Sequence, residues 1–444
     1  MTTVESERAR VLFQAGRFVE AERAARRLLA EARQAGDAAA EGRAHVLLGE
    51  IAYDGLRYDV SQQHLEQAVA LLGKAGGEGS PGEAGQGEWG RYARSCQAVL
   101  FALRGPADEA DRAIEAAREG APPPSPELAT LEALLWVNVT LAEVLRGRLA
   151  QARHVIDDLW HALEPDPSVD RALLGTVALQ RGVMLERAGE HASARALFER
   201  SLSLRTEAFG AENYRCAAAR LSLAGSLLAA GRRDEAVQEA SAAIDTIKRL
   251  GLDRYAPVSA GYATLGAAAL LSGRRDLATR SLEVGAALEE KTFGAASVAT
   301  ASMLVLLASS YAEEGNWGKV AAVTRRALPP LEASAGPELE MATELHVTGL
   351  TASGRAREAG VYAEARLSAL RGEGASPKLM AMLTWAAAQG YLATGNVKRA
   401  EPWLLRARAT AVAAYGEASV EVTDIDETMR LLAAGYRPRA RNLA

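Results

Sequence analysis

Four residues near the middle of the chain have types and spacing that could hold a metal ion: His154, Asp157, Asp158 and His161. Offsets of three, four and seven residues place them on adjacent turns of one helical face, where imidazole and carboxylate groups could share a cation. No other His or Cys falls near them in sequence. Because helices carry many such side chains on their solvent-facing side, we interpret this cluster as a solvated face and expect no metal.

A second pattern carries the letters of a dinucleotide-binding fingerprint, Gly77-x-Gly79-x-x-Gly82. Phosphate binding by that motif requires a strand before the glycines and a helix after them. Here the glycines belong to residues 73–90, GKAGGEGSPGEAGQGEWG, a polar Gly-rich stretch that follows a helical segment. We predict a flexible insertion loop over 73–90 and no bound nucleotide.

The remaining chemistry-bearing residues form no recognisable catalytic arrangement. Cys96 and Cys216 lie far apart, match no metal or redox spacing, and are expected to be buried, inert thiols. No Ser-His-Asp order, nucleophile elbow or phosphate-binding loop stands out. We therefore expect no enzyme activity and no cofactor, and keep an enzyme that uses the His154–His161 face as a remote alternative.

Composition limits the class of protein. Of 444 residues, 49% are hydrophobic and only 5% aromatic, and Ala and Leu dominate the apolar set, which favours close-packed helices over a large sheet. With 51 basic and 56 acidic residues the net charge is −5, so no nucleic-acid partner is expected. No signal peptide or membrane-spanning stretch is visible. A bacterial protein of the cytoplasm is the expectation, the bacterial source resting on the preference for Arg over Lys.

Glycines recur at a fixed distance along the chain. Each glycine follows an apolar stretch with helical periodicity and precedes a polar stretch that begins the next expected helix. From Gly105 to Gly315 the spacing is 42 residues at five successive intervals. Such a period predicts repeated pairs of antiparallel helices, with the glycine in the left-handed conformation between the two. The series is Gly16, Gly55, Gly105, Gly147, Gly189, Gly231, Gly273, Gly315, Gly354, Gly395 and Gly435.

Small residues occupy two positions at fixed distances from these glycines, and we call each set of equivalent positions a column. Ala stands five residues after most of them, with Val320 as an exception, and Ala or Gly stands seven residues before, as in Ala98, Gly182 and Ala224. In the second repeat, Gly49 and Ser61 join the two columns if the count starts from Leu56. Small side chains at both places let the two helices of a pair cross closely. Because one pair cannot bury its apolar stripe alone, the pairs must stack.

Gly-x-Phe-x-x-Ala at 16–21, with a small residue seven positions before the glycine, resembles the tetratricopeptide repeat. The 42-residue period, with Phe209-Gly210, Phe293-Gly294 and Tyr415-Gly416 near the end of the second helix, is most similar to the kinesin-light-chain type. The resemblance implies an all-α, right-handed superhelix of about ten helix pairs plus a C-terminal helix. We expect one solenoid over 1–444 with a basic C-terminal tail at 436–444.

By analogy with the family, the first helix of each pair lines a concave groove, with groove-facing positions nine and six residues before each glycine. These positions are small, weakly polar and partly apolar, which suits a packed apolar peptide or helix. The alternative is that the superhelix fills its own groove. The predicted partner-binding residues are Cys96, Val99, Asn138, Leu141, Gln180, Val183, Ser222, Gly225, Thr264, Ala267, Leu306, Ser309, Ala386 and Gln389.

Two functions fit these observations. The first is a non-catalytic scaffold or adaptor that binds another protein or a peptide in the groove. The second is a ligand- or peptide-sensing regulator of a transcriptional or enzymatic effector. A sharp apolar pocket on which polar groups converge would favour the second. No membrane insertion is expected, and the partner and the oligomeric state stay open.

Overall fold

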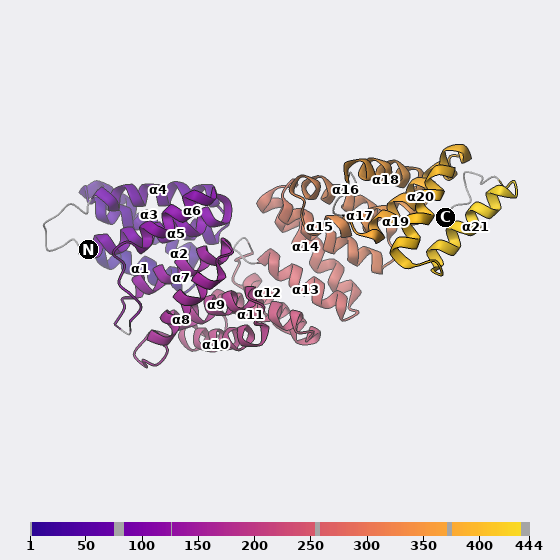
Figure 1. Ribbon diagram of the computed structural model, residues 1–444. Helices are drawn as coiled ribbons and strands as arrows, with labels where there is room; N and C mark the ends of the chain where they lie inside the picture. The colour runs from indigo at the N-terminus through magenta and orange to yellow at the C-terminus, as the bar shows by residue number, and fades with distance from the viewer. Residues whose placement is uncertain (1, 75–83, 126, 254–257, 371–374, 437–444) are drawn as a thin grey trace. The chain divides into compact units, whose positions relative to one another are not determined.

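The computed structural model describes residues 2–74, 84–125, 127–253, 258–370 and 375–436. Within these ranges the regular structure consists of 21 α-helices, without a strand. None of the described helices is long and apolar enough to cross a membrane. The chain divides into two compact units, residues 1–268 and 269–444, here called the N-terminal and C-terminal units (Figure 1).

The N-terminal unit contains six helix pairs and most of a thirteenth helix. Each pair consists of two helices that pack against each other, and the first helices of neighbouring pairs also touch, as α5 touches α7 and α7 touches α9. The helices are α1 (Thr2–Gln14), α2 (Phe18–Ala35), α3 (Ala38–Asp54), α4 (Tyr58–Lys74), α5 (Ala84–Arg104), α6 (Ala107–Arg118), α7 (Thr130–Leu145), α8 (Leu149–Leu163), α9 (Arg171–Arg187), α10 (His191–Phe209), α11 (Tyr214–Ala229), α12 (Arg233–Arg249) and α13 (Val258–Leu271).

The C-terminal unit continues the same pattern, because α15 packs on α16, α17 on α18 and α19 on α20. The last helix, α21, packs on α20. The helices are α14 (Arg275–Phe293), α15 (Val298–Glu313), α16 (Trp317–Ser334), α17 (Leu339–Ala352), α18 (Ala356–Leu370), α19 (Pro377–Ala393), α20 (Val397–Tyr415) and α21 (Val420–Ala433). The all-α helix-repeat fold is thus confirmed, while one continuous solenoid over the whole chain stays a prediction.

The turn within each pair follows the predicted glycine series with two differences. Nine of the eleven glycines have positive φ, from 70° to 89°, as a left-handed helix end requires. Gly55 and Gly105 do not. In the second pair the left-handed residue is Leu56, with φ of 57°, which matches the register that also brings Gly49 and Ser61 into the two columns of small residues.

The small residues lie where the helices of a pair cross. Ala98, Ala224 and their equivalents are fully buried. At Gly182 a Cβ atom would come within 2.6 Å of the Phe198 ring, so α9 and α10 can approach this closely only because the side chain is absent. The predicted crossing is therefore confirmed in atomic detail.

The structure differs from the predicted loop over 73–90 at both ends. Helix α4 continues to Lys74 and α5 already begins at Ala84, while residues 75–83, which include the Gly77-x-Gly79-x-x-Gly82 motif, lie outside the described residues. The helix extends across the polar stretch because Trp89 and Tyr92 pack into an apolar cluster that Leu72 shares. Of the predicted tail at 436–444, only Tyr436 is described, and it is half exposed.

Candidate functional site

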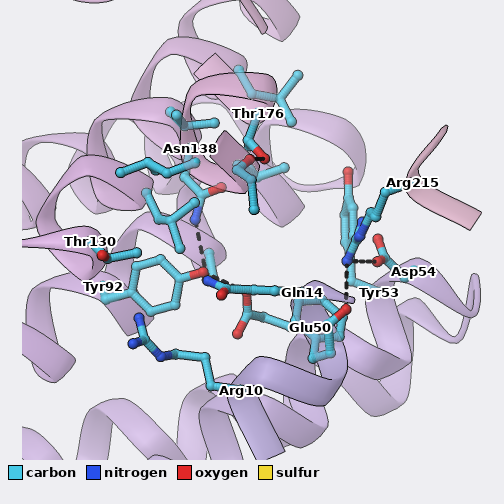
Figure 2. Close-up of a pocket in the computed structure, with 18 of the residues that line it drawn as sticks. Arg10, Gln14, Glu50, Tyr53, Asp54, Tyr92, Thr130, Asn138, Thr176 and Arg215 are labelled. Carbon is cyan, nitrogen blue, oxygen red and sulfur yellow. Dashed lines mark hydrogen bonds and ion pairs between the residues drawn. The ribbon is translucent and has the colours of Figure 1, made fainter. Parts of the chain in front are cut away.

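A cavity of about 220 Å³ lies inside the N-terminal unit. The first helix of every pair from α1 to α11 contributes to its wall, as expected for the concave side of stacked pairs. The lining contains both apolar and polar side chains, and Figure 2 labels several of the polar ones. The lining residues used below are Arg10, Phe13, Gln14, Glu50, Tyr53, Asp54, Tyr92, Cys96, Val99, Leu134, Val137, Asn138, Leu141, Asp170, Thr176, Arg205 and Arg215.

Helices α1 and α11, about two hundred residues apart in sequence, meet and close one side of this cavity. Asn213, the N-cap of α11, donates a hydrogen bond from Nδ2 to the carbonyl oxygen of Ala15 at 2.7 Å. The rings of Phe18 and Tyr214 pack edge to face with centroids 4.9 Å apart. We call this contact between the first and the sixth pair the α1–α11 seam. It turns an open groove into a pocket.

Arg215 ties the seam to the cavity wall. Its Nη2 lies 3.2 Å from Asp54 Oδ2 and donates to the carbonyl oxygen of Phe13 at 3.3 Å. The guanidinium group also lies over the rings of Phe13 and Phe18, with centroid distances of 4.9 and 5.3 Å. Arg215 thus contacts two aromatic rings and one carboxylate, and Figure 2 shows its contact with Asp54.

A carboxylate occupies one side of the cavity. Glu50 on α3 accepts a hydrogen bond from the Tyr92 hydroxyl at 2.5 Å, and the Gln14 amide points toward the same place (Figure 2). Burial raises the pKa of Glu50 to about 7, assisted by the nearby Asp54 carboxylate and opposed by Arg215 and Arg10. Burial also raises the pKa of Asp54. A carboxyl group whose pKa is strongly shifted and that lines a cavity is typical of functional sites.

A guanidinium group occupies another part of the wall. Arg205 on α10 is buried, and its Nη1 donates to the carbonyl oxygen of Arg215 at 2.8 Å. Its Nε–H is buried without a hydrogen-bond partner among the described residues. Burial lowers the pKa of Arg205 to about 9, and the neighbouring Arg215 acts in the same direction. Gly175 makes room for this side chain, since a Cβ there would come within 2.8 Å of Arg205 Cγ.

Four of the predicted groove residues line the cavity: Cys96, Val99, Asn138 and Leu141. Asn138 donates from Nδ2 to Ser95 Oγ at 3.1 Å and lies 3.4 Å from Cys96 Sγ. Burial raises the pKa of the Cys96 thiol well above its usual range, so the thiol is neutral and unreactive. The structure thus brings these two predicted columns together at one surface.

The other predicted groove residues do not line this cavity. Gln180 is buried, and the rest of those in the N-terminal unit are half-buried on α9, α11 and α13: Val183, Ser222, Gly225, Thr264 and Ala267. In the C-terminal unit, α15 carries Leu306 and Ser309, and α19 carries Ala386 and Gln389. These positions stay predictions for a partner surface.

The charged residues of the cavity were not among the predicted groove residues, although the repeat spacing points to two of them. Arg10 stands six residues before Gly16, and Glu50 stands six before Leu56, so both occupy the predicted groove column of the first two pairs. If the second pair is counted from Gly55, the position six residues before it is Gly49, and Glu50 does not fall on the predicted groove position. No comparable signal existed for Asp54 with Arg215, because the two are brought together only when α1 and α11 meet.

The helical face that carries His154 and His161 is part of the solvent-exposed surface. Asp157 accepts a hydrogen bond from Arg181 Nε at 2.7 Å, and His154 Nδ1 lies 3.6 Å from Asp158 Oδ2 in an exposed setting. His161 is also exposed. In the described part of the chain, no group of three or more His, Cys, Asp or Glu side chains is placed to hold a metal ion.

Comparison with known proteins supports the repeat assignment. The tetratricopeptide repeat family profile matches residues 173–249, which span α9 to α12. No curated protein matches the sequence significantly.

Among solved structures, a Rap protein complexed with competence and sporulation factor is similar with a TM-score of 0.50. It is 12% identical, over 88% of this chain and 99% of that one. The apo form of RapI has a TM-score of 0.50 and 11% identity over 88% and 98%. A Signal Transduction ATPase with Numerous Domains from Pyrococcus horikoshii, with a tetratricopeptide repeat sensor, has a TM-score of 0.51 and 14% identity over 76% and 47%.

These similarities concern the fold, and they agree with the helix pairs, the left-handed turns and the small residues at the crossings. The kinesin-light-chain subtype stays a prediction. Residues 173–249 match the tetratricopeptide repeat family, and the fold of the chain is that of stacked helix pairs.

Proposed function

We propose that this chain is a ligand-sensing regulatory protein whose N-terminal unit binds a small molecule in the cavity and passes that state to a partner protein. The observation that carries this proposal is the cavity itself, whose wall includes Glu50, Tyr92 and Arg205 beside apolar side chains. Ligand sites are concave, mostly apolar and supplied with a few fixed polar groups. A non-catalytic role is part of the proposal.

The position of the cavity supports regulation over simple scaffolding. A scaffold that only displays its surface needs no cavity lined by charged groups, and each buried charge costs stability. Here the wall is completed by the α1–α11 seam, so a ligand that contacts several helices would hold this closure in place. A partner that recognises the closed or the open form would then respond to the ligand.

The structural neighbours are compatible with this reading. One is a Rap protein complexed with competence and sporulation factor, and another carries a tetratricopeptide repeat sensor. What these names state holds for those proteins. For this chain, the neighbours support a general role in protein interaction or sensing. The cavity is what favours a ligand-sensing role over a scaffold.

The test compares the wild-type chain with a variant whose cavity is filled. Thr176 lines the cavity and is half-buried, so Thr176→Phe should occupy part of it, whereas Ser203→Phe adds the same ring on the exposed side of α10. A deproteinised small-molecule extract of the host cells should raise the unfolding temperature of the wild type and of Ser203→Phe but not of Thr176→Phe. An unchanged wild type, or an equal shift in all three, contradicts the proposal.

The regulatory part has its own measurement. Bound ligand should slow amide hydrogen exchange in α1 and α11 of the full chain, because it stabilises the seam that joins them. If the extract raises the unfolding temperature without protecting these two helices, ligand binding stands and its coupling to closure is wrong.

A further inference from the structure

Two charged groups in the cavity wall form no ion pair within the described structure. Of the other charged lining residues, Arg10 pairs with Glu7 at 2.5 Å, Arg215 pairs with Asp54, and Asp170 caps the first turn of α9 at the exposed rim. The charges that remain are the Glu50 carboxylate and the Arg205 guanidinium. In the described structure neither of these two forms an ion pair, so the wall presents one charge of each sign without a directly bound counter-charge.

Each of these groups has hydrogen-bonding capacity left. Glu50 receives one hydrogen bond, from Tyr92, and is half-buried, with its remaining surface at the cavity it lines. Arg205 uses Nη1 on a backbone carbonyl, and its buried Nε–H is without a partner among the described residues. A guanidinium group has five donors, and a carboxylate accepts about four bonds. A buried charge in this state gains most from a ligand group of opposite charge.

The size of the cavity limits the ligand. A cavity of 150 Å³ holds one benzene molecule. By proportion, the 220 Å³ of this cavity holds roughly nine heavy atoms, the size of free leucine. A peptide of several residues would extend beyond it. The apolar side chains of Leu134, Val137 and Leu141 occupy one face of α7 and supply a surface for a hydrocarbon group.

We propose that the cavity binds a free α-amino acid with an apolar side chain. Its ammonium group lies at Glu50 and its carboxylate at Arg205, while its side chain packs against α7. This inference rests on the proposed function and gives its ligand a chemical class. A zwitterion of this size supplies one partner for each unmatched charge, and it adds no net charge to the cavity.

Ligands that lack one of the two charges should bind worse. An amine without the carboxylate leaves Arg205 unmatched, and a carboxylate without the amine leaves Glu50 unmatched, each at the cost of desolvating a charge without compensation. Sites that bond a polar substrate group reject analogues lacking it far more strongly than analogues that differ by a methylene. We therefore expect at least a tenfold difference in Kd.

The experiment is titration calorimetry of the full chain at pH 8 with three probes of equal hydrocarbon size: L-leucine, isopentylamine and 4-methylpentanoate. L-leucine should bind at least tenfold more tightly than either analogue. Glu50→Gln should remove its advantage over 4-methylpentanoate, and Arg205→Met its advantage over isopentylamine. Exposed positions serve as matched controls: Glu31→Gln on α2 and Arg200→Met on α10 should leave all three affinities unchanged.

Other outcomes overturn the assignment. If either analogue binds as tightly as L-leucine, the ligand carries a single charge. If the cell extract stabilises the wild type but L-leucine, L-valine, L-isoleucine, L-methionine and L-phenylalanine do not, the amino-acid class is wrong and the sensor proposal stands. If neither stabilises it, both fail. Should Arg205→Met lose its helical circular dichroism, Arg205→Lys keeps the charge and should retain at least part of the discrimination against isopentylamine.

Discussion

At the scale of single residues, the chain keeps charges where they cost stability. Glu50 has its pKa raised to about 7 by burial, while the hydrogen bond from Tyr92 on α5 and the charges of Arg215 on α11 and Arg10 on α1 favour the ionised form. Asp54, on the same helix, opposes it. An ionised carboxylate in this place lowers the free energy of unfolding relative to a neutral side chain.

Replacing Glu50 by Gln should stabilise the protein at high pH and not at low pH. The folded-state pKa lies above the unfolded value, so the wild type loses stability as pH rises from about 4.5 to about 7, and the loss is complete above that range. The gain in Glu50→Gln should reach roughly 1 to 3 kcal/mol at pH 8 and vanish near pH 4. Urea unfolding at both pH values checks this, with Glu31→Gln as the exposed control. An equal gain at both pH values contradicts it.

A second residue-scale expectation concerns the turn of the second pair. Leu56 has φ of 57°, a conformation that costs a branched side chain about 1 kcal/mol, and Gly147 has φ of 75° with open space around it. Leu56→Gly should therefore raise the free energy of unfolding by about 0.5 to 1 kcal/mol, and Gly147→Ala should lower it by about 1 kcal/mol. Chemical denaturation measures both, and two changes of the same sign would show that local contacts outweigh backbone strain.

At the scale of elements, close approach of paired helices depends on missing side chains. Glycine inside a helix normally weakens it relative to alanine. At Gly182 this cost is offset, because Phe198 of α10 occupies the space that a side chain would need. Gly225 in α11 has no heavy atom within 4 Å of an added Cβ and shows no such requirement.

The two glycines should therefore respond to the same substitution with opposite signs. Gly182→Ala places a Cβ 2.6 Å from the Phe198 ring and 3.3 Å from the Ala194 carbonyl oxygen, and should cost about 1 to 3 kcal/mol. Gly225→Ala should stabilise by about 0.5 to 1 kcal/mol. Thermal and urea unfolding of the full chain decide the matter. A neutral Gly182→Ala would mean that α10 shifts without cost.

At the scale of the whole molecule, the chain consists of two compact units that each stack helix pairs around their own core. Repeat proteins owe their stability to contacts between neighbouring pairs. The N-terminal unit adds one long-range contact, the α1–α11 seam, through which its first and sixth pairs meet.

Weakening the seam should therefore loosen the N-terminal unit selectively. Arg215→Gln removes the cation–π contacts with Phe13 and Phe18 and leaves the half-buried Asp54 without its partner, at a cost of about 1 to 3 kcal/mol. Hydrogen exchange of the full chain should accelerate in α1 and α11 and stay unchanged in residues 269–444. Arg249→Gln, which removes an exposed pair with Glu212, should have little effect. Equal acceleration in both units would contradict this picture.

The sequence by itself determined the elements and their pairing. The 42-residue period, the turn glycines and the two columns of small residues are local or nearest-neighbour features, so each can be recognised within one repeat. The repeat spacing also places Arg10 and Glu50 at groove positions, provided that the second pair is counted from Leu56.

Only the tertiary structure decided that a groove becomes a cavity. Asp54 and Arg215, or Ala15 and Asn213, meet because small rotations between successive pairs add up until α1 reaches α11. No single repeat encodes that sum, since it depends on the packing of every pair between them. The same closure withdraws Glu50 and Arg205 from bulk water, and that burial, which no local pattern reveals, gives the cavity its chemistry.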